Sequence, residues 1–145
     1  MTEVSFHFNV PDKLAYSCRL LRKAVRRGAR VAVLAQAQDL AQLDRALWEL
    51  APTEFLSHCI AGSAGPAVLG ASAVVLCDSV AQAGHDQVLL NLDADVPAGF
   101  ERFGRLIELV GCDDGDRERS RLRWKHYTAR GYSISRHDVA GQAVR

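Results

Sequence analysis

The sequence predicts a three-layer α/β domain with a mostly parallel sheet, and three observations support this prediction. Strand-like and helix-like segments alternate along the first half of the chain, as they do where helices connect parallel strands. Several strand-like segments are continuous apolar runs, the pattern of strands covered on both faces. The length of 145 residues suits a single domain with one sizeable core.

Two strand–helix units open the chain. Residues 4–9 alternate apolar and polar side chains, as a strand does, and Pro11 marks the turn into a helix that ends at Gly28. Residues 30–35 form an apolar strand, and residues 40–48 carry the apolar stripe of a second helix. The stripe of the first helix is Leu14, Cys18, Leu21 and Val25. Its opposite face is basic, and we expect this face to be solvated. The basic residues are Arg19, Arg22, Lys23, Arg26 and Arg27.

The second half of the chain adds further strands. Residues 55–60 form a short apolar segment, followed by a flexible Gly- and Ala-rich connection at residues 61–66. Residues 73–77 and 87–92 are apolar runs typical of strands. Residues 105–110 fit either a strand or the end of a helix, and we favour the strand.

We predict one domain over residues 1–135, because no internal repeat, low-complexity tract or linker divides the chain. Residues 136–145 carry no motif. We expect this C-terminal tail to be partly disordered.

A basic, aromatic segment at residues 114–130 is predicted to be a helix. Asp113 and its acidic neighbours lie where carboxylates cap a helix N-terminus, and Gly131 lies where a helix stops. At about 100° per residue, one face is cationic with an aromatic ring in its middle. This face comprises Arg117, Arg121, Trp124, Lys125 and Thr128. We expect the neighbouring face to anchor the helix on the core through Leu122, His126 and Ala129.

The positive charge is concentrated near the C-terminus. Residues 113–145 carry 8 Lys and Arg against 5 Asp and Glu, whereas residues 1–112 carry 10 against 12. This asymmetry favours an acidic partner docked at the C-terminal end of the domain. No apolar run approaches a membrane span and the N-terminus lacks the pattern of a signal peptide, so we expect a cytoplasmic protein with no membrane partner.

The sequence offers no evidence for a cofactor, a metal or a catalytic group. The first strand-to-helix turn, residues 8–12, contains no glycine, and residues 61–65 lack the Gly-Lys-Ser/Thr ending of a phosphate loop. The sheet is therefore expected to have no nucleotide-binding loop. The histidines are scattered, and the four cysteines lack a C-x-x-C pair. We expect Cys18, Cys59, Cys77 and Cys112 to be buried reduced thiols.

Four segments of the chain are distinctive when taken together. They are Leu43-Asp-Arg-Ala-Leu47-Trp48, Phe55-Leu-Ser-His58, Arg121-Leu-Arg-Trp124-Lys125-His-Tyr127 and Arg130-Gly131-Tyr132. Together they closely resemble the chi subunit of bacterial DNA polymerase III holoenzyme. The resemblance extends from the first strand to about Ser135. Two positions depart from the family pattern. Trp124 stands where Tyr is commoner, and Arg117 stands where a Lys can occur.

The resemblance implies a Rossmann-like fold without nucleotide chemistry and a non-catalytic adaptor of the replication machinery. One surface would bind the psi subunit of the clamp loader, and another the acidic C-terminal tail of single-stranded-DNA-binding protein, so that DNA is contacted only indirectly. The residues implied for the tail are Arg117, Arg121, Trp124 and Lys125, bordered by Val110 and Gly131. Those implied for psi are Trp48, Phe55 and His58. Whether this chain has a psi partner, or exchanges onto a helicase, stays open.

Two other classes of function also stay open. The basic C-terminal helix would suit direct nucleic-acid binding, although the net charge of +1 argues against this role. A small α/β enzyme acting on a nucleotide is the other class, and the glycine-poor first turn argues against it. Trp48 and Phe55 would more commonly be core residues, so their assignment to an interface rests on the resemblance.

Overall fold

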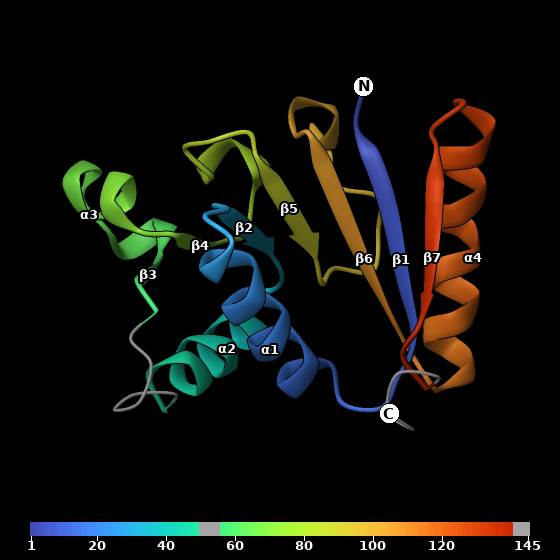
Figure 1. The fold of residues 1–145 in the computed structure, drawn as a ribbon, viewed down its shortest axis with the longest axis horizontal. Helices are drawn as coiled ribbons and strands as arrows, with labels where there is room; N and C mark the ends of the chain where they lie inside the picture. Colours follow the sequence, from blue (N-terminus) through green and yellow to red (C-terminus); the bar gives the residue numbers. More distant parts are fainter. Residues whose placement is uncertain (50–55, 141–145) are drawn as a thin grey trace.

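The computed structural model describes residues 1–49 and 56–140, and over these residues the predicted α/β fold is confirmed (Figure 1). The strands are β1 (Glu3–Val10), β2 (Val31–Leu34), β3 (His58–Ile60), β4 (Val74–Cys77), β5 (Val88–Asn91), β6 (Arg105–Gly111) and β7 (Ile134–Asp138). The helices are α1 (Lys13–Arg26), α2 (Ala37–Glu49), α3 (Pro66–Ala71) and α4 (Asp114–Ala129). Short 3-10 turns are η1 (Ala61–Ser63), η2 (Val80–Gln82) and η3 (Phe100–Arg102). The strand favoured at residues 105–110 is β6.

The described strands form a seven-stranded sheet in which every neighbouring pair is parallel. Their order is β3-β4-β2-β5-β6-β1-β7. β1 lies between β6 and β7, so Val4 pairs with Leu106 on one side and with Ile134 on the other. The register with β6 shifts between His7 and Val10, where Asn9 adopts a left-handed φ of 60°. Asparagine tolerates this conformation better than most residues.

β7 is an element that the sequence does not predict. It pairs with β1 through Asp138, so residues 136–138 belong to the sheet and not to the predicted C-terminal tail. The strand reads Ile-Ser-Arg-His-Asp and lacks both an apolar run and a regular apolar alternation. The local pattern of apolar residues therefore does not predict that this segment pairs with β1. Residues 141–145 lie outside the described part.

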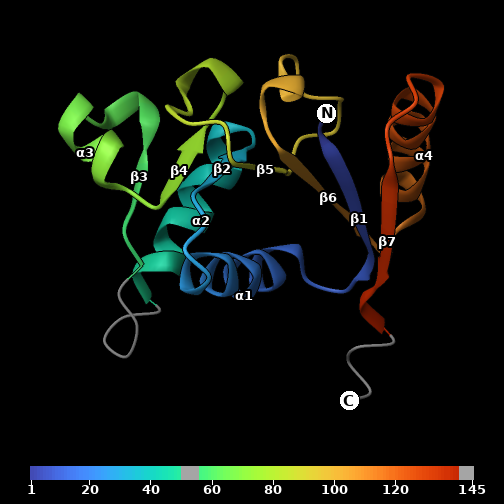
Figure 2. The same ribbon diagram turned by 45° about the horizontal axis from the view of Figure 1, so that its top comes forward.

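Helices cover both faces of the sheet, which gives three layers (Figures 1 and 2). On one face, α1 and α2 pack through residues such as Leu21 and Leu43 into one buried cluster. On the other face, Tyr127 of α4 joins Phe100 and Phe103 in a second cluster. Continuous burial of strands such as Val31–Leu34 follows from this double coverage.

The face by which α4 contacts the sheet corrects the prediction of an anchor at Leu122, His126 and Ala129. Leu122 is 68% exposed, Ala129 is exposed and His126 is only partly buried. The buried residues of the helix are Asp116, Ser120, Arg123 and Tyr127. Because this anchor is mostly polar, apolar periodicity points to the wrong face.

A fully buried carboxylate at the centre of β6 holds α4. Arg123 Nε donates to Glu108 Oε1 at 3.1 Å, and the Tyr127 hydroxyl donates to Oε2 at 2.5 Å. Asn91 Nδ2 on β5 lies 3.1 Å from both carboxylate oxygens. Burial raises the pKa of Glu108, while Arg123 and the hydrogen bonds oppose that rise. A buried carboxylate is tolerated when it is paired and hydrogen-bonded in this way.

A second set of contacts fixes the start of α4. The Asp113 side chain caps the helix by accepting from the Asp116 amide at 3.0 Å. Asp116 Oδ2 accepts from the Gly111 amide at 2.6 Å and lies 2.7 Å from Lys13 Nζ. Burial alone would raise the pKa of Asp116, but the Lys13 and Gly111 contacts outweigh it and lower that pKa. The end of β6 is thereby joined to α1 and α4.

The cysteine prediction is correct for three residues and wrong for one. Cys18, Cys59 and Cys77 are buried and free, and burial raises the pKa of Cys77 to about 12. Cys112 is exposed because it lies in the turn between β6 and α4. Within residues 1–49 and 56–140, no group of three or more His, Cys, Asp or Glu side chains is placed to hold a metal ion. None of the described helices combines the length and the apolar character needed to cross a membrane.

We predict that Arg123→Met lowers the free energy of unfolding by about 3 kcal/mol, because the buried Glu108 carboxylate loses its cation. Urea unfolding at neutral pH measures this change. Arg121→Met, an exposed site two residues earlier, serves as the matched control and should change it by less than about 0.5 kcal/mol. Adding Glu108→Gln to Arg123→Met should recover part of the loss, and an unchanged or larger loss would contradict the pairing.

We predict that Asp116→Asn costs about 1 kcal/mol at pH 7, a modest value because Lys13 is more than a third exposed. The folded pKa of Asp116 is lowered, so its stabilising contribution is present above the unfolded pKa of about 3.9 and is lost as pH falls through the folded value. The free energies of unfolding of the two proteins should therefore approach each other as the pH falls from about 3.9 through the folded pKa of Asp116. A difference independent of pH would contradict the ion pair.

Candidate functional site

A pocket of about 610 Å³ lies between α4 and strands β1, β6 and β7. We call it the α4 pocket. It is lined by Phe6, Phe8, Asn9, Val110, Arg117, Ser120, Arg121, Trp124 and Arg136. The four helical residues have i, i+3, i+4 and i+7 spacing, which places them on one face of α4. Phe6 and Phe8 share a face of β1 because side chains alternate along a strand.

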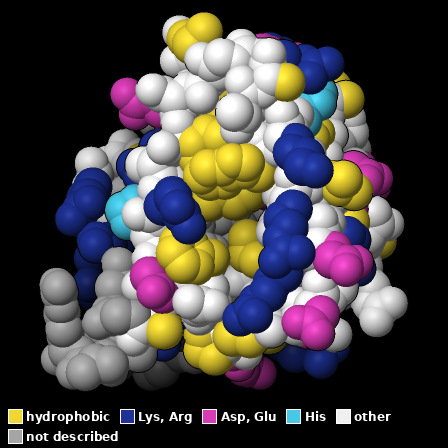
Figure 3. Space-filling model, turned by 90° about the vertical axis from the view of Figure 1, so that its right-hand side faces the viewer, with side chains coloured by type: hydrophobic (Ala, Val, Ile, Leu, Met, Phe, Trp, Pro, Cys, Tyr) yellow, Lys and Arg dark blue, Asp and Glu magenta, His cyan; other side chains and the backbone are white. Residues whose placement is uncertain are grey.

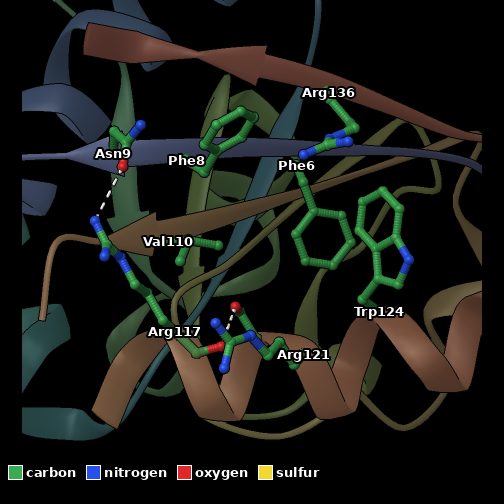
Figure 4. A pocket seen from close by; sticks show the side chains of 9 residues that line it. Phe6, Phe8, Asn9, Val110, Arg117, Arg121, Trp124 and Arg136 are labelled. Carbon is green, nitrogen blue, oxygen red and sulfur yellow. Dashed lines mark hydrogen bonds between the residues drawn. The ribbon is translucent and has the colours of Figure 1, made fainter. Parts of the chain in front are cut away.

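The inner part of the α4 pocket is aromatic (Figure 4). The Phe6 and Trp124 rings have centroids 5.1 Å apart. The Arg136 guanidinium lies 5.4 Å from the centroid of Phe8 and 5.6 Å from that of Trp124. A guanidinium placed over two rings in this way gains cation–π attraction and is held in position. The pocket thus offers both an apolar wall and a fixed positive charge.

Two further arginines line the α4 side of the pocket, and they differ in their hydrogen bonding. Arg117 donates to Asn9 Oδ1 at 3.2 Å (Figure 4). Asn9 in turn donates to Asp138 at 3.0 Å. Arg121 is exposed and has no hydrogen bond or ion pair with any described residue. Its guanidinium donors are therefore available to an anionic ligand.

The charge of the α4 pocket is uniformly positive. Its nine lining residues include three arginines and no carboxylate. On this side of the molecule an apolar surface is flanked by Lys and Arg side chains (Figure 3). The lining also contains no His, Cys, Asp or Glu that would act as a general acid or base. Such a surface suits binding of an anionic, partly apolar ligand.

The structure brings together four of the six residues assigned to tail binding. Arg117, Arg121, Trp124 and Val110 line the α4 pocket, whereas Lys125 and Gly131 do not. Lys125 is exposed on α4, and Gly131 ends the helix with a φ of 80°.

Sequence reasoning missed the other lining residues. They are Phe6, Phe8, Asn9, Ser120 and Arg136. Strand alternation over residues 4–9 would place Phe6 and Phe8 on one face, although not beside α4. Arg136 has no such signal, because β7 itself is not predicted.

A second candidate surface lies at the end of α2. Trp48 is 55% exposed, and its ring centroid lies 4.8 Å from that of His58 on β3. The His58 side chain is buried, with Nδ1 2.7 Å from the Leu56 carbonyl and Nε2 3.3 Å from Asp44 Oδ1. His58 thus supports Trp48 from beneath. Phe55, the third residue assigned to psi binding, lies outside the described residues.

Comparison with known proteins gives a family match over most of the chain. The family model described as DNA polymerase III chi subunit, HolC, matches residues 1–135. DNA polymerase III subunit chi of Pseudomonas aeruginosa is 28% identical over 145 residues, covering 94% of this chain and 96% of that protein. DNA polymerase III subunit chi of Haemophilus influenzae is 26% identical over 124 residues, covering 85% of each. The protein therefore belongs to the chi subunit (HolC) family of DNA polymerase III.

Proposed function

We propose that this chi-family protein is a non-catalytic adaptor of the polymerase III holoenzyme in the cytoplasm. Its α4 pocket binds the acidic C-terminal tail of single-stranded-DNA-binding protein, and the surface around Trp48 binds the psi subunit of the clamp loader. The observation that carries the proposal is the exposed Arg121, which has no ion pair with any described residue, beside the Phe6–Trp124 ring pair.

The chemistry of the α4 pocket matches that of an acidic peptide ending in phenylalanine. The terminal carboxylate and acidic side chains would pair with Arg121 and with the flanking Arg117 and Arg136. The terminal ring would pack on the Phe6 and Trp124 wall, where burial of apolar surface adds affinity. Lys125 and Gly131 would lie at the rim and contribute less.

The exposed Trp48 supports a protein interface at the end of α2. An exposed tryptophan is an uncommon feature of a free surface and a frequent anchor of protein interfaces. His58 holds the ring from below, and this preorganisation would favour binding. By resemblance to the family, Phe55 would also contact psi.

We predict that a peptide copying the acidic tail binds with a micromolar, salt-sensitive affinity and that Arg121→Ala weakens it by at least about 2 kcal/mol. Isothermal titration at low and physiological salt measures the change. Arg119→Ala is the matched control, because Arg119 is exposed on α4 outside the pocket. Absence of binding at low salt, or an equal loss with both variants, would rule out the α4 pocket. Single-stranded DNA binding that is lost with Arg121→Ala would instead favour nucleic-acid recognition by α4.

We predict that Trp48→Ala weakens binding of a psi subunit by about 2 kcal/mol, as expected for a tryptophan anchor. A pull-down with purified psi, followed by titration, measures this loss. Leu122→Ala, at another strongly exposed apolar residue, should leave psi binding unchanged. Trp48→Ala should also leave tail-peptide binding intact, because the two surfaces lie on different elements. Retained psi binding by Trp48→Ala would remove this surface from the proposal.

A further inference from the structure

A second cleft, of about 580 Å³, lies on the opposite face of the sheet, between α1 and strands β1, β6 and β7. We call it the α1 cleft. The alternation of β1 and β7 separates it from the α4 pocket. Phe6 and Arg136 line the α4 pocket, whereas His7 and His137 line the α1 cleft. A ligand in one site therefore leaves the other site open.

The α1 cleft is strongly basic. Four cations line it, namely Arg19, Lys23, Arg27 and Arg105, and its lining includes no carboxylate. All four are exposed, and none forms an ion pair with a described residue. The basic side of α1 is largely exposed, as expected for a solvated helix face. The hollow between that side and Arg105 on β6 also concentrates positive potential.

The other wall of the cleft is formed by rings. The His7 and His137 rings have centroids 4.6 Å apart, and Tyr16 lies edge-on to His7 at 5.7 Å. The Arg19 guanidinium lies 5.7 Å from the Tyr16 centroid. His7 Nδ1 and the Tyr16 hydroxyl are hydrogen-bonded at 2.5 Å. The rings and the nearest cation thus form one connected surface.

His7 has an unused polar atom. The residue is only 9% exposed, and its Nε2 has no hydrogen-bond partner among the described residues. Burial, followed by the charges of His137, Arg105 and Lys23, lowers the pKa of His7 to about 4, so the ring is neutral near pH 7. Buried polar atoms normally have hydrogen-bond partners. A polar group of a ligand bound in the cleft could be the partner of His7 Nε2.

We propose that the α1 cleft binds single-stranded nucleic acid, with the cations on its phosphates and the rings against its bases. Arg19, Lys23 and Arg27 follow at four-residue intervals, which is about 6 Å per step along a helix. That spacing is comparable to the separation of neighbouring phosphates in an extended strand. A basic groove combined with aromatic side chains is the usual arrangement of sequence-tolerant single-strand binders.

The rings favour nucleic acid over an acidic peptide as the occupant. Both ligands would be attracted by four cations, but only a nucleic acid presents flat bases to the rings that line the cleft. The assignment is independent of the tail proposal, because it uses other residues on the other face of the sheet. It adds a direct DNA contact to an adaptor for which DNA contact was expected only through a partner.

Fluorescence anisotropy of a labelled oligothymidylate of about ten nucleotides, titrated with the full chain, tests the proposal. We expect binding at low salt that Lys23→Glu weakens about tenfold, with a salt slope smaller by about one. Arg45→Glu makes the same kind of charge reversal at an exposed residue of α2 outside both sites and should have little effect. Arg121→Glu, in the α4 pocket, should also retain binding. Tyr16→Ala should weaken binding about tenfold, whereas Tyr16→Phe keeps the ring and should retain it.

Several results would overturn the proposal. They are no binding at low salt, an equal loss with Lys23→Glu and Arg45→Glu, or a loss with Arg121→Glu instead. Displacement by polyglutamate as effective as that by unlabelled oligothymidylate would assign the cleft to acidic peptides. Displacement by thymidine monophosphate at similar concentration would assign it to mononucleotides. Lys23 is exposed, so its variant tests the cleft even if Tyr16→Ala fails to fold.

Discussion

The buried carboxylate of Glu108 is the contact on which the position of α4 depends. It lies at the centre of β6. Among the described residues, only groups on β5 and α4 form hydrogen bonds with this carboxylate and so compensate its burial. A polar contact of this kind is directional, unlike apolar packing, so it sets the rotation of the helix about its own axis. With Arg123 and Tyr127 turned inward, Arg121 and Trp124 are turned toward β1 and β7. The geometry of the α4 pocket is thus a consequence of charge pairing in the core.

The elements that sequence reasoning predicted are those with a strong apolar signal. β2, β4 and β5 are short, fully or largely buried runs, and α1 and α2 carry regular apolar stripes. The inward face of α4 was misassigned because its contacts are made by Arg123 and Tyr127, whose polar groups satisfy Glu108. β7 was missed because its pairing with β1 depends on a partner more than 120 residues earlier. Neither relation is visible in a local window of sequence.

The candidate site also contains residues that the sequence predicts and residues that only the fold brings together. Arg117, Arg121 and Trp124 share one face of a single helix, and helical geometry is enough to bring them together. Phe6, Phe8 and Arg136 enter the α4 pocket from two other elements, and only the strand order β6-β1-β7 places them there. The α1 cleft needs the same information, since Arg105 and His137 face the basic side of α1 only in the folded sheet. Sequence alone can identify the helix of a site, whereas the opposite wall requires the tertiary fold.

β7 also has a consequence for how the molecule avoids unwanted association. It lies at one end of the strand order, and an edge strand presents backbone groups that can template pairing with another chain. Three of its five residues, Arg136, His137 and Asp138, have ionisable side chains, and Ile134 is its one large aliphatic residue. Charged side chains on an edge strand disfavour the addition of another strand. The polarity that hides β7 from hydrophobic pattern analysis therefore also protects the edge of the sheet against aggregation.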